Sequence, residues 1–282
     1  MKRILTVQDI SCVGKCSGTV AVPVLSAMGI EAALLPTAVL STHTGFKGFT
    51  FRDLTDDIPS IEQHWADLGL TFEAFYSGYL GSMRQVQMIR DLFCHLKRDG
   101  DLVLVDPVMA DYGKFYTGFG PEFASQMCVL CSEADIVVPN LTEACFLDET
   151  PYREDMPLDE QKALCRRLAA RGMKQIVLTG VQLSGDTIGA MHYDAASDIF
   201  SVSQTARIPA QFHGTGDLFA SALLGGILIG KSVPDAMELA VGYIAECMRI
   251  TLEDEDHVFY GVEFEKATPW LLEHAGLFAR SR

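Results

Sequence analysis

A short segment in the last third of the chain, residues 213–217 (HGTGD), has the residue types of an anion-binding turn. Its two glycines and its small hydroxyl residue permit a tight turn with exposed backbone N–H groups. The apolar run 218–226 is typical of a buried helix, so these N–H groups would lie at the positive end of a helix dipole. Asp217 would repel an anion, but it would be useful as a base for a hydroxyl that attacks phosphorus. The alternative is a glycine-rich turn in which Asp217 only caps the helix.

Two further acidic residues are candidates for holding a divalent cation. Asp106 follows the apolar segment 102–105, and Glu143 follows the apolar segment 136–138 after a short polar stretch. At the ends of neighbouring strands, their carboxylates would suit a Mg²⁺ ion that bridges to phosphates, directly or through water. Each has a structural alternative, which is helix capping for Asp106 and a solvated position in a first helical turn for Glu143. As a pair beside the 213–217 turn, they favour the metal.

Two other motifs point away from common functions. Gly14, Lys15 and Cys16 do not form a Walker phosphate loop, because no glycine lies five residues before Gly14 and Cys16 replaces the hydroxyl residue. Cys128 and Cys131 form a lone CxxC without a second cysteine pair or a nearby histidine pair, which argues against a zinc or redox role. A GxGxxG sequence is also missing after the first predicted strand, which weakens a dinucleotide-binding interpretation.

Two histidines and one loop have open roles. His43 lies between Thr42 and Thr44, and we expect it to shape a pocket, because nothing in the segment pairs it with a nucleophile. His213 could contact a substrate or only cap the turn, and the sequence does not decide between these. Residues 111–118 form a glycine- and aromatic-rich loop that could fold over a ligand or remain a plain surface excursion.

The charge balance restricts the partners of the chain. Its 282 residues carry a formal net charge of −15, with 37 acidic and 22 basic residues. Such a field repels nucleic acid and anionic membranes, and a polyanionic substrate would need local positive charge or Mg²⁺. No apolar run is long enough to span a membrane. Eight cysteines and the lack of a signal peptide predict free thiols in a reducing cytoplasm.

Short apolar segments alternate with segments of helical spacing along most of the chain. The predicted strands cover residues 4–7, 32–36, 74–76, 102–105, 136–138 and 175–179. The predicted helices cover residues 20–28, 83–97, 123–131, 159–171, 218–229 and 234–252. Residues 187–193 and 199–202 are typical of an antiparallel hairpin at one edge of the sheet. This alternation predicts right-handed βαβ units, a mostly parallel sheet covered on both faces, and a single domain over residues 1–282.

Polar and glycine-rich segments follow most of the predicted strands. They cover residues 8–15, 39–45, 77–82, 106–113 and 139–143. In an open parallel sheet, ligands bind beyond the carboxyl ends of the strands. The gathering of polar residues at one end of the sheet therefore indicates an enzyme rather than a structural domain.

These residues resemble the ribokinase-like superfamily and, within it, the pyridoxal/pyridoxine/pyridoxamine kinases, over nearly the whole chain. The segments that carry the resemblance are Gly214-Thr215-Gly216-Asp217, Asp106-Pro107-Val108-Met109, Pro139-Asn140-Leu141-Thr142-Glu143, Ser77-Gly78-Tyr79-Leu80-Gly81-Ser82 and Ser41-Thr42-His43-Thr44-Gly45. The first of these marks the superfamily, and the last two point more narrowly to vitamin B6 kinases. The resemblance implies a three-layer α/β/α sandwich with a mostly parallel central sheet, usually a homodimer, that uses ATP and Mg²⁺ and in many members K⁺.

On the nucleotide side, the resemblance implies that Asp217 is the catalytic base. The backbone amides of Gly214, Thr215 and Gly216 would form the anion hole for the phosphates. The other nucleotide-binding positions that it implies are Asp106, Val138, Glu143 and Thr179, of which Asp106 and Glu143 also bind the metal. Many members of the family carry a lysine near the ATP phosphates after the sixth strand, where this chain has Thr179-Gly180.

On the substrate side, the resemblance implies that Thr44, with Gly45 beside it, contacts substituents of a pyridine ring and that Asp217 also touches the substrate. The loop after the first strand commonly reads Ser-His-Val in these kinases, whereas this chain has Asp9-Ile10-Ser11. Either Asp9 or Ser11 could take the role of contacting the ring.

The residues and the resemblance together predict ATP-dependent phosphorylation of the 5′-hydroxymethyl group of a vitamin B6 vitamer, with Asp217 as general base. One alternative is a kinase of the same fold for hydroxymethylpyrimidine or another small alcohol. A second alternative is a non-catalytic ligand-binding protein on a kinase scaffold.

Overall fold

A long, mostly parallel sheet forms the centre of the molecule in the computed structural model, which describes residues 2–182 and 185–278. Within these residues the sheet has nine strands in the order β11-β10-β9-β8-β5-β4-β1-β2-β3. The strands are β1 (Arg3–Ser11), β2 (Glu31–Leu40), β3 (Phe51–Asp53), β4 (Ala74–Ser77), β5 (Leu102–Val105), β8 (Ile136–Val137), β9 (Gln175–Val181), β10 (Thr187–Asp194) and β11 (Ile199–Ala206). The remaining two strands, β6 (Ala110–Asp111) and β7 (Lys114–Phe115), form a separate small hairpin.

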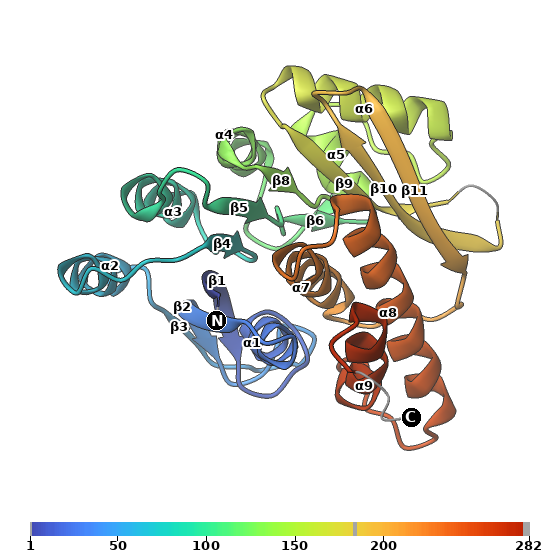
Figure 1. Ribbon diagram of the computed structural model, residues 1–282, viewed down its shortest axis with the longest axis horizontal. Helices are drawn as coiled ribbons and strands as arrows, with labels where there is room; N and C mark the ends of the chain where they lie inside the picture. The colour runs from blue at the N-terminus through green and yellow to red at the C-terminus, as the bar shows by residue number, and fades with distance from the viewer. Residues whose placement is uncertain (1, 183–184, 279–282) are drawn as a thin grey trace.

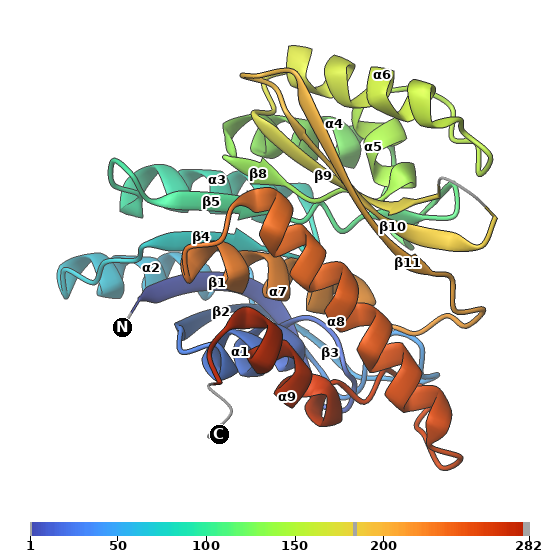
Figure 2. The same ribbon diagram turned by 45° about the vertical axis from the view of Figure 1, so that its right-hand side comes forward.

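Helices cover both faces of the sheet. One layer contains α1 (Gly18–Ala27), α7 (Thr215–Leu228), α8 (Val233–Glu253) and α9 (Phe264–Ala275). The other contains α2 (Ile58–Asp67), α3 (Met83–Leu96), α4 (Pro121–Glu133), α5 (Leu141–Leu147) and α6 (Leu158–Ala170). Figures 1 and 2 show α7 lying against the middle of the sheet, with α1 and α8 on either side of it. The three-layer α/β/α sandwich that we expect from the sequence is therefore confirmed.

The apolar sequences of the central elements explain this arrangement. Every residue of β4 is buried, because a strand between two helix layers has no solvent face. The helix α7 is apolar around almost its whole circumference, and it packs between α1 and α8 on the sheet. Polar side chains that a ligand could reach are therefore expected at the ends of these strands and helices.

Most predicted elements are confirmed, but several boundaries differ. The strands β1 and β2 extend to Ser11 and Leu40, so Asp9 and Ser11 lie within a strand and not in a loop after it. The antiparallel pair β10–β11 lies at one edge of the sheet, as predicted. The sequence analysis missed β3, the β6–β7 hairpin, α2, α5 and α9. These elements are short or largely polar, so neither hydrophobic periodicity nor length distinguishes them from loops.

Candidate active site

The carboxyl ends of the parallel strands bring the predicted site residues together at one end of the sheet. The parallel pairs β1–β4, β4–β5, β5–β8 and β8–β9 form the middle of the sheet. Asp106 directly follows β5, and its backbone N–H donates to the Ser77 carbonyl at the end of β4 (2.9 Å). Asn140 and Thr179 form a parallel bridge beyond the end of β8. The prediction that Asp106 and Glu143 follow neighbouring strands is confirmed, since β5 pairs with β8.

The turn before α7 requires glycine at position 214. Gly214 is the N-cap residue and has a left-handed backbone conformation (φ 78°). A Cβ atom at this position would lie 1.7 Å from the carbonyl oxygen of Lys15. The loop before α1 therefore packs directly on the start of α7, and it does so only because residue 214 has no side chain.

Asp217 lies in the first turn of α7, after the N-cap residue Gly214. The carboxylate accepts a hydrogen bond from the backbone of Ser17, in the loop before α1. Gly214 is the N-cap residue and has no side chain that could cap the helix, so Asp217 is not the helix cap that the alternative interpretation assumed. Burial raises the pKa of Asp217 to about 7, and the Asp9 carboxylate adds to this increase.

Four carboxylates of the site influence one another. Burial raises the pKa of Asp106 well above its ordinary value, and the carboxylates of Glu143 and Asp217 raise it further. Burial also raises the pKa of Glu143, although backbone N–H groups oppose this effect. The pKa of Asp9 is raised by burial as well. Buried acids that repel one another are typical of functional sites, because their mutual repulsion opposes folding.

Glu143 has a defined structural role that the sequence analysis did not foresee. Its Oε2 accepts from the Asn140 N–H (2.9 Å), and the Asn140 Oδ1 accepts from the Glu143 N–H (2.9 Å), which together form a capping box at the start of α5. Its Oε1 accepts from the Met109 N–H (3.0 Å). Glu143 is 3% exposed, so the alternative interpretation of Glu143 as a solvated acid in a first turn is wrong.

The donor set fits a Mg²⁺ ion that is bound mainly by phosphate oxygens. Among the described residues, only burial and the neighbouring carboxylates shift the pKa of Asp106, whereas both Glu143 oxygens already accept backbone N–H groups. Among residues 2–182 and 185–278, no three histidine, cysteine or acidic side chains form a complete metal site. A cation here would thus take Asp106 and, through a remaining lone pair or water, Glu143, and would need further oxygens from a ligand.

The side chains of Asp9 and Ser11, the two candidates for contacting the ring, contact each other. The Ser11 hydroxyl donates to the Asp9 Oδ2 (3.1 Å), and both residues are buried, with exposures of 1% and 5%. Cys16 lies beside them, and burial, with the charges of Asp217 and Asp9, raises the pKa of its thiol to about 12. Asp9 and Ser11 therefore lie near Asp217, where the sequence predicts the substrate side.

A cluster of rings surrounds the segment 43–45, which the sequence assigns to the substrate side. The His43 ring lies 4.7 Å from the His213 ring, and the Phe46 ring lies 5.5 Å from the Tyr260 ring. The Gly45 N–H donates to the His43 Nδ1 (2.9 Å). His213 thus packs against His43, whereas Thr44 and Gly45 are both exposed.

The 111–118 loop forms the β6–β7 hairpin, which reaches toward the segment before α7. The Gln211 side chain donates to the Tyr112 hydroxyl (2.6 Å), a contact between residues 99 positions apart. Tyr116 lies near the carboxylates, since Glu143 and Asp217 contribute to the increase in its pKa. That this hairpin acts as a lid stays a prediction.

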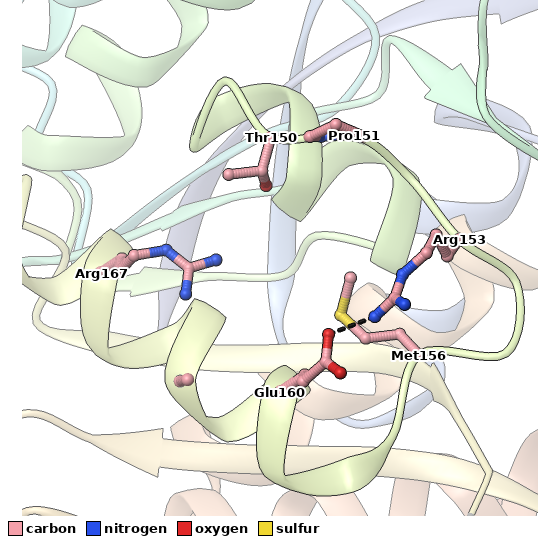
Figure 3. A pocket seen from close by; sticks show the side chains of 7 residues that line it. Thr150, Pro151, Arg153, Met156, Glu160 and Arg167 are labelled. Atoms are coloured by element: carbon pink, nitrogen blue, oxygen red, sulfur yellow. Dashed lines mark hydrogen bonds and ion pairs between the residues drawn. The ribbon is translucent and has the colours of Figure 1, made fainter.

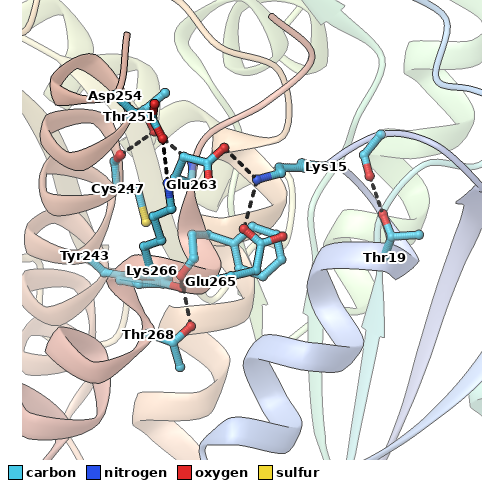
Figure 4. A network of polar contacts seen from close by, with 12 residues as sticks. Lys15, Thr19, Tyr243, Cys247, Thr251, Asp254, Glu263, Glu265, Lys266 and Thr268 are labelled. Carbon is cyan, nitrogen blue, oxygen red and sulfur yellow. Dashed lines mark hydrogen bonds and ion pairs between the residues drawn. The ribbon is translucent and has the colours of Figure 1, made fainter. Parts of the chain in front are cut away.

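Lys15 has a structural partner rather than a phosphate-binding geometry. Its Nζ forms ion pairs with Glu263 (3.2 Å) and Glu265 (2.9 Å) at the start of α9 (Figure 4). The side chain also packs against Gly261, at which a Cβ would lie 2.4 Å from the Lys15 Cβ. Lys15 therefore connects the loop before α1 to the C-terminal part of the chain.

The remaining predicted nucleotide-binding residues, Val138 and Thr179, form hydrogen bonds with the backbone of neighbouring strands and loops. Val138 is buried, and its N–H donates to the Val105 carbonyl (2.9 Å). The Thr179 N–H donates to the Pro139 carbonyl (2.9 Å), and its hydroxyl lies 3.5 Å from the same oxygen. Their assignment to nucleotide binding stays a prediction.

The sequence analysis missed a buried polar group beside the carboxylates. The Tyr76 hydroxyl lies near Gln8 and Ser221, and Asp106 and Asp217 add to the burial that raises its pKa. Within the part of the chain that the structure describes, none of these three side chains makes a hydrogen bond of good geometry. The only signal in the sequence is a polar residue inside an otherwise apolar strand or helix.

Two surface hollows lie away from this site. One, of about 440 Å³, lies between the end of α5 and α6, where Arg153 forms an ion pair with Glu160 (Figure 3). The other, of about 490 Å³, is lined by residues at the amino end of β5, opposite to Asp106. Neither brings together the predicted site residues.

In this structure, the carboxyl ends of a parallel sheet lie beside the start of a helix that follows a glycine-rich turn and carries an aspartate in its first turn. This is the arrangement of the ribokinase-like kinases of small molecules. A family model described as phosphomethylpyrimidine kinase matches residues 24–259. The chain is 31% identical to a pyridoxal kinase of Arabidopsis thaliana, over 92% of this chain and 85% of the relative. It is 28% identical to a pyridoxine/pyridoxal/pyridoxamine kinase of Bordetella avium, over 88% of this chain and 85% of the relative.

Solved structures agree with these relatives. A Bacteroides thetaiotaomicron protein provisionally described as a phosphomethylpyrimidine kinase, crystallised with pyridoxal, superimposes with a TM-score of 0.91 at 36% identity, covering 96% of this chain and 95% of that one. A pyridoxal kinase of Lactobacillus plantarum gives a TM-score of 0.89 at 30% identity, covering 97% of each chain. The chain belongs to the phosphomethylpyrimidine kinase family, and its resemblance to the pyridoxal kinases is confirmed.

Proposed function

We propose that this protein is an ATP-dependent kinase that transfers a phosphoryl group to the 5′-hydroxymethyl group of a vitamin B6 vitamer. The observation that carries the proposal is the position of Asp217, a half-buried residue in the first turn of α7 whose carboxylate lies close enough to Asp106, at the end of β5, to raise its pKa. The Arabidopsis relative is named a pyridoxal kinase, and the Bacteroides structure contains pyridoxal, which supports a B6 substrate.

In the proposed mechanism, Asp217 accepts the proton of the hydroxyl group while the oxygen attacks the γ-phosphorus in line. A base works best when its pKa lies near the working pH, and burial raises the pKa of Asp217 to about 7. The first N–H groups of α7, at Thr215, Gly216 and Asp217, have no partner within the helix and would face the charge that develops on the phosphoryl oxygens.

Asp106 would hold a Mg²⁺ ion together with Glu143, and this ion supplies positive charge to the phosphates when it is bound. We assign Val138 and Thr179 to the nucleotide. On the substrate side, Asp9, Ser11, Thr44 and Gly45 would surround the ring. Activation by K⁺ is part of the proposal, and exchange of K⁺ for Na⁺ in the assay tests it.

The proposal also includes the organisation of the protein. We propose a single domain over residues 1–282, because one continuous sheet connects both halves of the described chain. We propose a cytoplasmic enzyme, which agrees with its eight free cysteines. No helix of the described residues is long and apolar enough to cross a membrane. We also propose a homodimer, which agrees with the exposed Phe51 on the edge strand β3.

A second candidate is a hydroxymethylpyrimidine kinase, which the match to the phosphomethylpyrimidine kinase model favours. The test is release of ADP from ATP in the presence of pyridoxal, pyridoxine, pyridoxamine or hydroxymethylpyrimidine. We expect turnover with at least one B6 vitamer. Turnover with hydroxymethylpyrimidine alone would replace the proposal by the second candidate. Binding of one of these alcohols without release of ADP from ATP would indicate a ligand-binding protein.

A further inference from the structure

The pairing of β1 with β2 is irregular beside Asp9, and the extra residue of the bulge lies in β2. Gln8 pairs with Pro36 and Ile10 pairs with Val39, so two steps along β1 lie opposite three steps along β2. Such a bulge bends the strands and re-aims the side chains beside it, and bulges are frequent next to active sites. Here the bulge lies opposite the carboxyl end of β1, beside the residue whose carboxylate is close enough to Asp217 to raise the pKa of that group.

Neighbouring hydroxyl groups hold the Asp9 carboxylate in place but do not neutralise it. The Ser11 hydroxyl donates to it (3.1 Å), and the Ser17 side chain contributes a second hydrogen bond. Among the described residues, no lysine or arginine is one of the groups that shift the pKa of Asp9 or of Asp217. The nearby cation, Lys15, forms ion pairs with Glu263 and Glu265 instead. Two carboxylates thus share a buried site without a cation from the protein.

The metal proposed for the phosphates does not account for Asp9. In the sheet, β4 separates β1 from β5, so the ends of β1 and β5 lie about 10 Å apart at the usual strand spacing. Neither Asp106 nor Glu143 contributes to the pKa shift of Asp9. A serine hydroxyl would be enough to donate a hydrogen bond to a neutral ring or to accept one from it. A buried carboxylate is unfavourable until a positive charge pairs with it.

We propose that Asp9 selects substrates that carry a protonated ring nitrogen, through a charge-assisted hydrogen bond from the ring N–H⁺ to its carboxylate. This inference rests on the proposed function, in which Asp217 faces the hydroxymethyl group of the same ring. The ring nitrogen of a B6 vitamer lies two ring positions from the carbon that bears the 5′-hydroxymethyl group. One ring would therefore present its hydroxyl group to Asp217 and its positive charge to Asp9. The site recognises a cationic heterocycle and discriminates against neutral aromatic alcohols.

The test compares pyridoxine with its carbocyclic analogue, in which C–H replaces the ring nitrogen. Wild type, Asp9→Asn and the control Asp99→Asn are assayed with both alcohols. Asp99 is an exposed acid in the loop before β5, at the opposite end of the sheet. We expect wild type and the control to prefer pyridoxine by about 10- to 100-fold in kcat/KM, mainly through KM, since hydrogen bonds to charged groups are worth that much. Asp9→Asn should reduce the preference to within about threefold.

Binding and stability measurements keep the result interpretable. Titration of each protein with both compounds, without ATP, measures the same preference independently of turnover. If wild type binds pyridoxine preferentially but releases no ADP, the proposed function fails and the role of Asp9 stands. The melting temperature of Asp9→Asn should not fall, because the variant removes an unpaired buried charge. The inference is overturned if Asp9→Asn loses affinity for both compounds to the same extent. It is also overturned if the variant prefers pyridoxine as strongly as wild type does, or if wild type does not prefer pyridoxine.

Discussion

Replacement of Asp217 by asparagine should stabilise the ligand-free protein at alkaline pH and nearly abolish its activity. The asparagine side chain has the same shape and its oxygen can still accept the hydrogen bond from the Ser17 backbone. The substitution therefore removes the charge and the basicity with little change in packing. Both effects have the same physical origin, which is a carboxylate held in a buried site where its ionised form is disfavoured.

The size and sign of the stability change follow from the pKa. The folded protein raises the pKa of Asp217 from 3.8 to about 7, so it binds the proton more tightly than the unfolded chain does. The stability from this group is complete below about pH 4 and is lost as the pH rises toward 7. A shift of this size corresponds to at most ~4 kcal/mol. Since Asp217 remains partly exposed as a residue, solvent weakens the effect, and we expect ~1–2 kcal/mol, or about 2–5 °C in Tm.

The measurements are thermal unfolding of wild type, Asp217→Asn and the control Asp99→Asn between pH 5 and pH 8, and ADP release at pH 8. The advantage in Tm of Asp217→Asn should grow with pH, and its kcat should fall by about 10²- to 10⁴-fold with little change in the KM for ATP. A variant that keeps the kcat of wild type would show that Asp217 is not the base. A variant that is less stable than wild type at pH 8 would refute the electrostatic reasoning.

Three further predictions concern the framework of the site. Gly214→Ala should lower the free energy of unfolding in urea by more than ~2 kcal/mol, because its Cβ would meet the Lys15 carbonyl oxygen. Gly216→Ala is the control, since a Cβ there has open space, and its free energy of unfolding should lie within ~1 kcal/mol of that of wild type. Equal values for the two variants would disprove the close approach. Glu143→Ala should cost about 2–4 kcal/mol, since it leaves the N–H groups of Asn140 and Met109 without their acceptor, and an unchanged Tm would contradict this. Lys15→Met should lower the Tm by a few degrees and leave the KM for ATP within about twofold, and a large increase in that KM would instead indicate a phosphate contact.

Local sequence was sufficient to predict the βαβ alternation and the edge hairpin. Apolar strands such as β5 and helices such as α3 have the period and length that distinguish them, and each predicted segment forms the expected element. The short helix α5 was missed, because its seven residues follow a strand without a clear apolar face. The extension of β1 to Ser11 was also missed, since polar residues at the end of a strand look like the start of a loop.

The sequence by itself determined the chemistry available to this protein, since Asp217 follows two glycines in a turn and Asp106 follows a buried strand. Only the tertiary structure decided how these groups affect one another. Burial of four carboxylates, none of them paired with a lysine or arginine among the described residues, arises from strands and helices distant in sequence, and it raises their pKa values. The left-handed Gly214 likewise depends on the Lys15 carbonyl, almost 200 residues earlier. Electrostatic energies and close packing depend on distances in space, which a residue pattern along the chain does not contain.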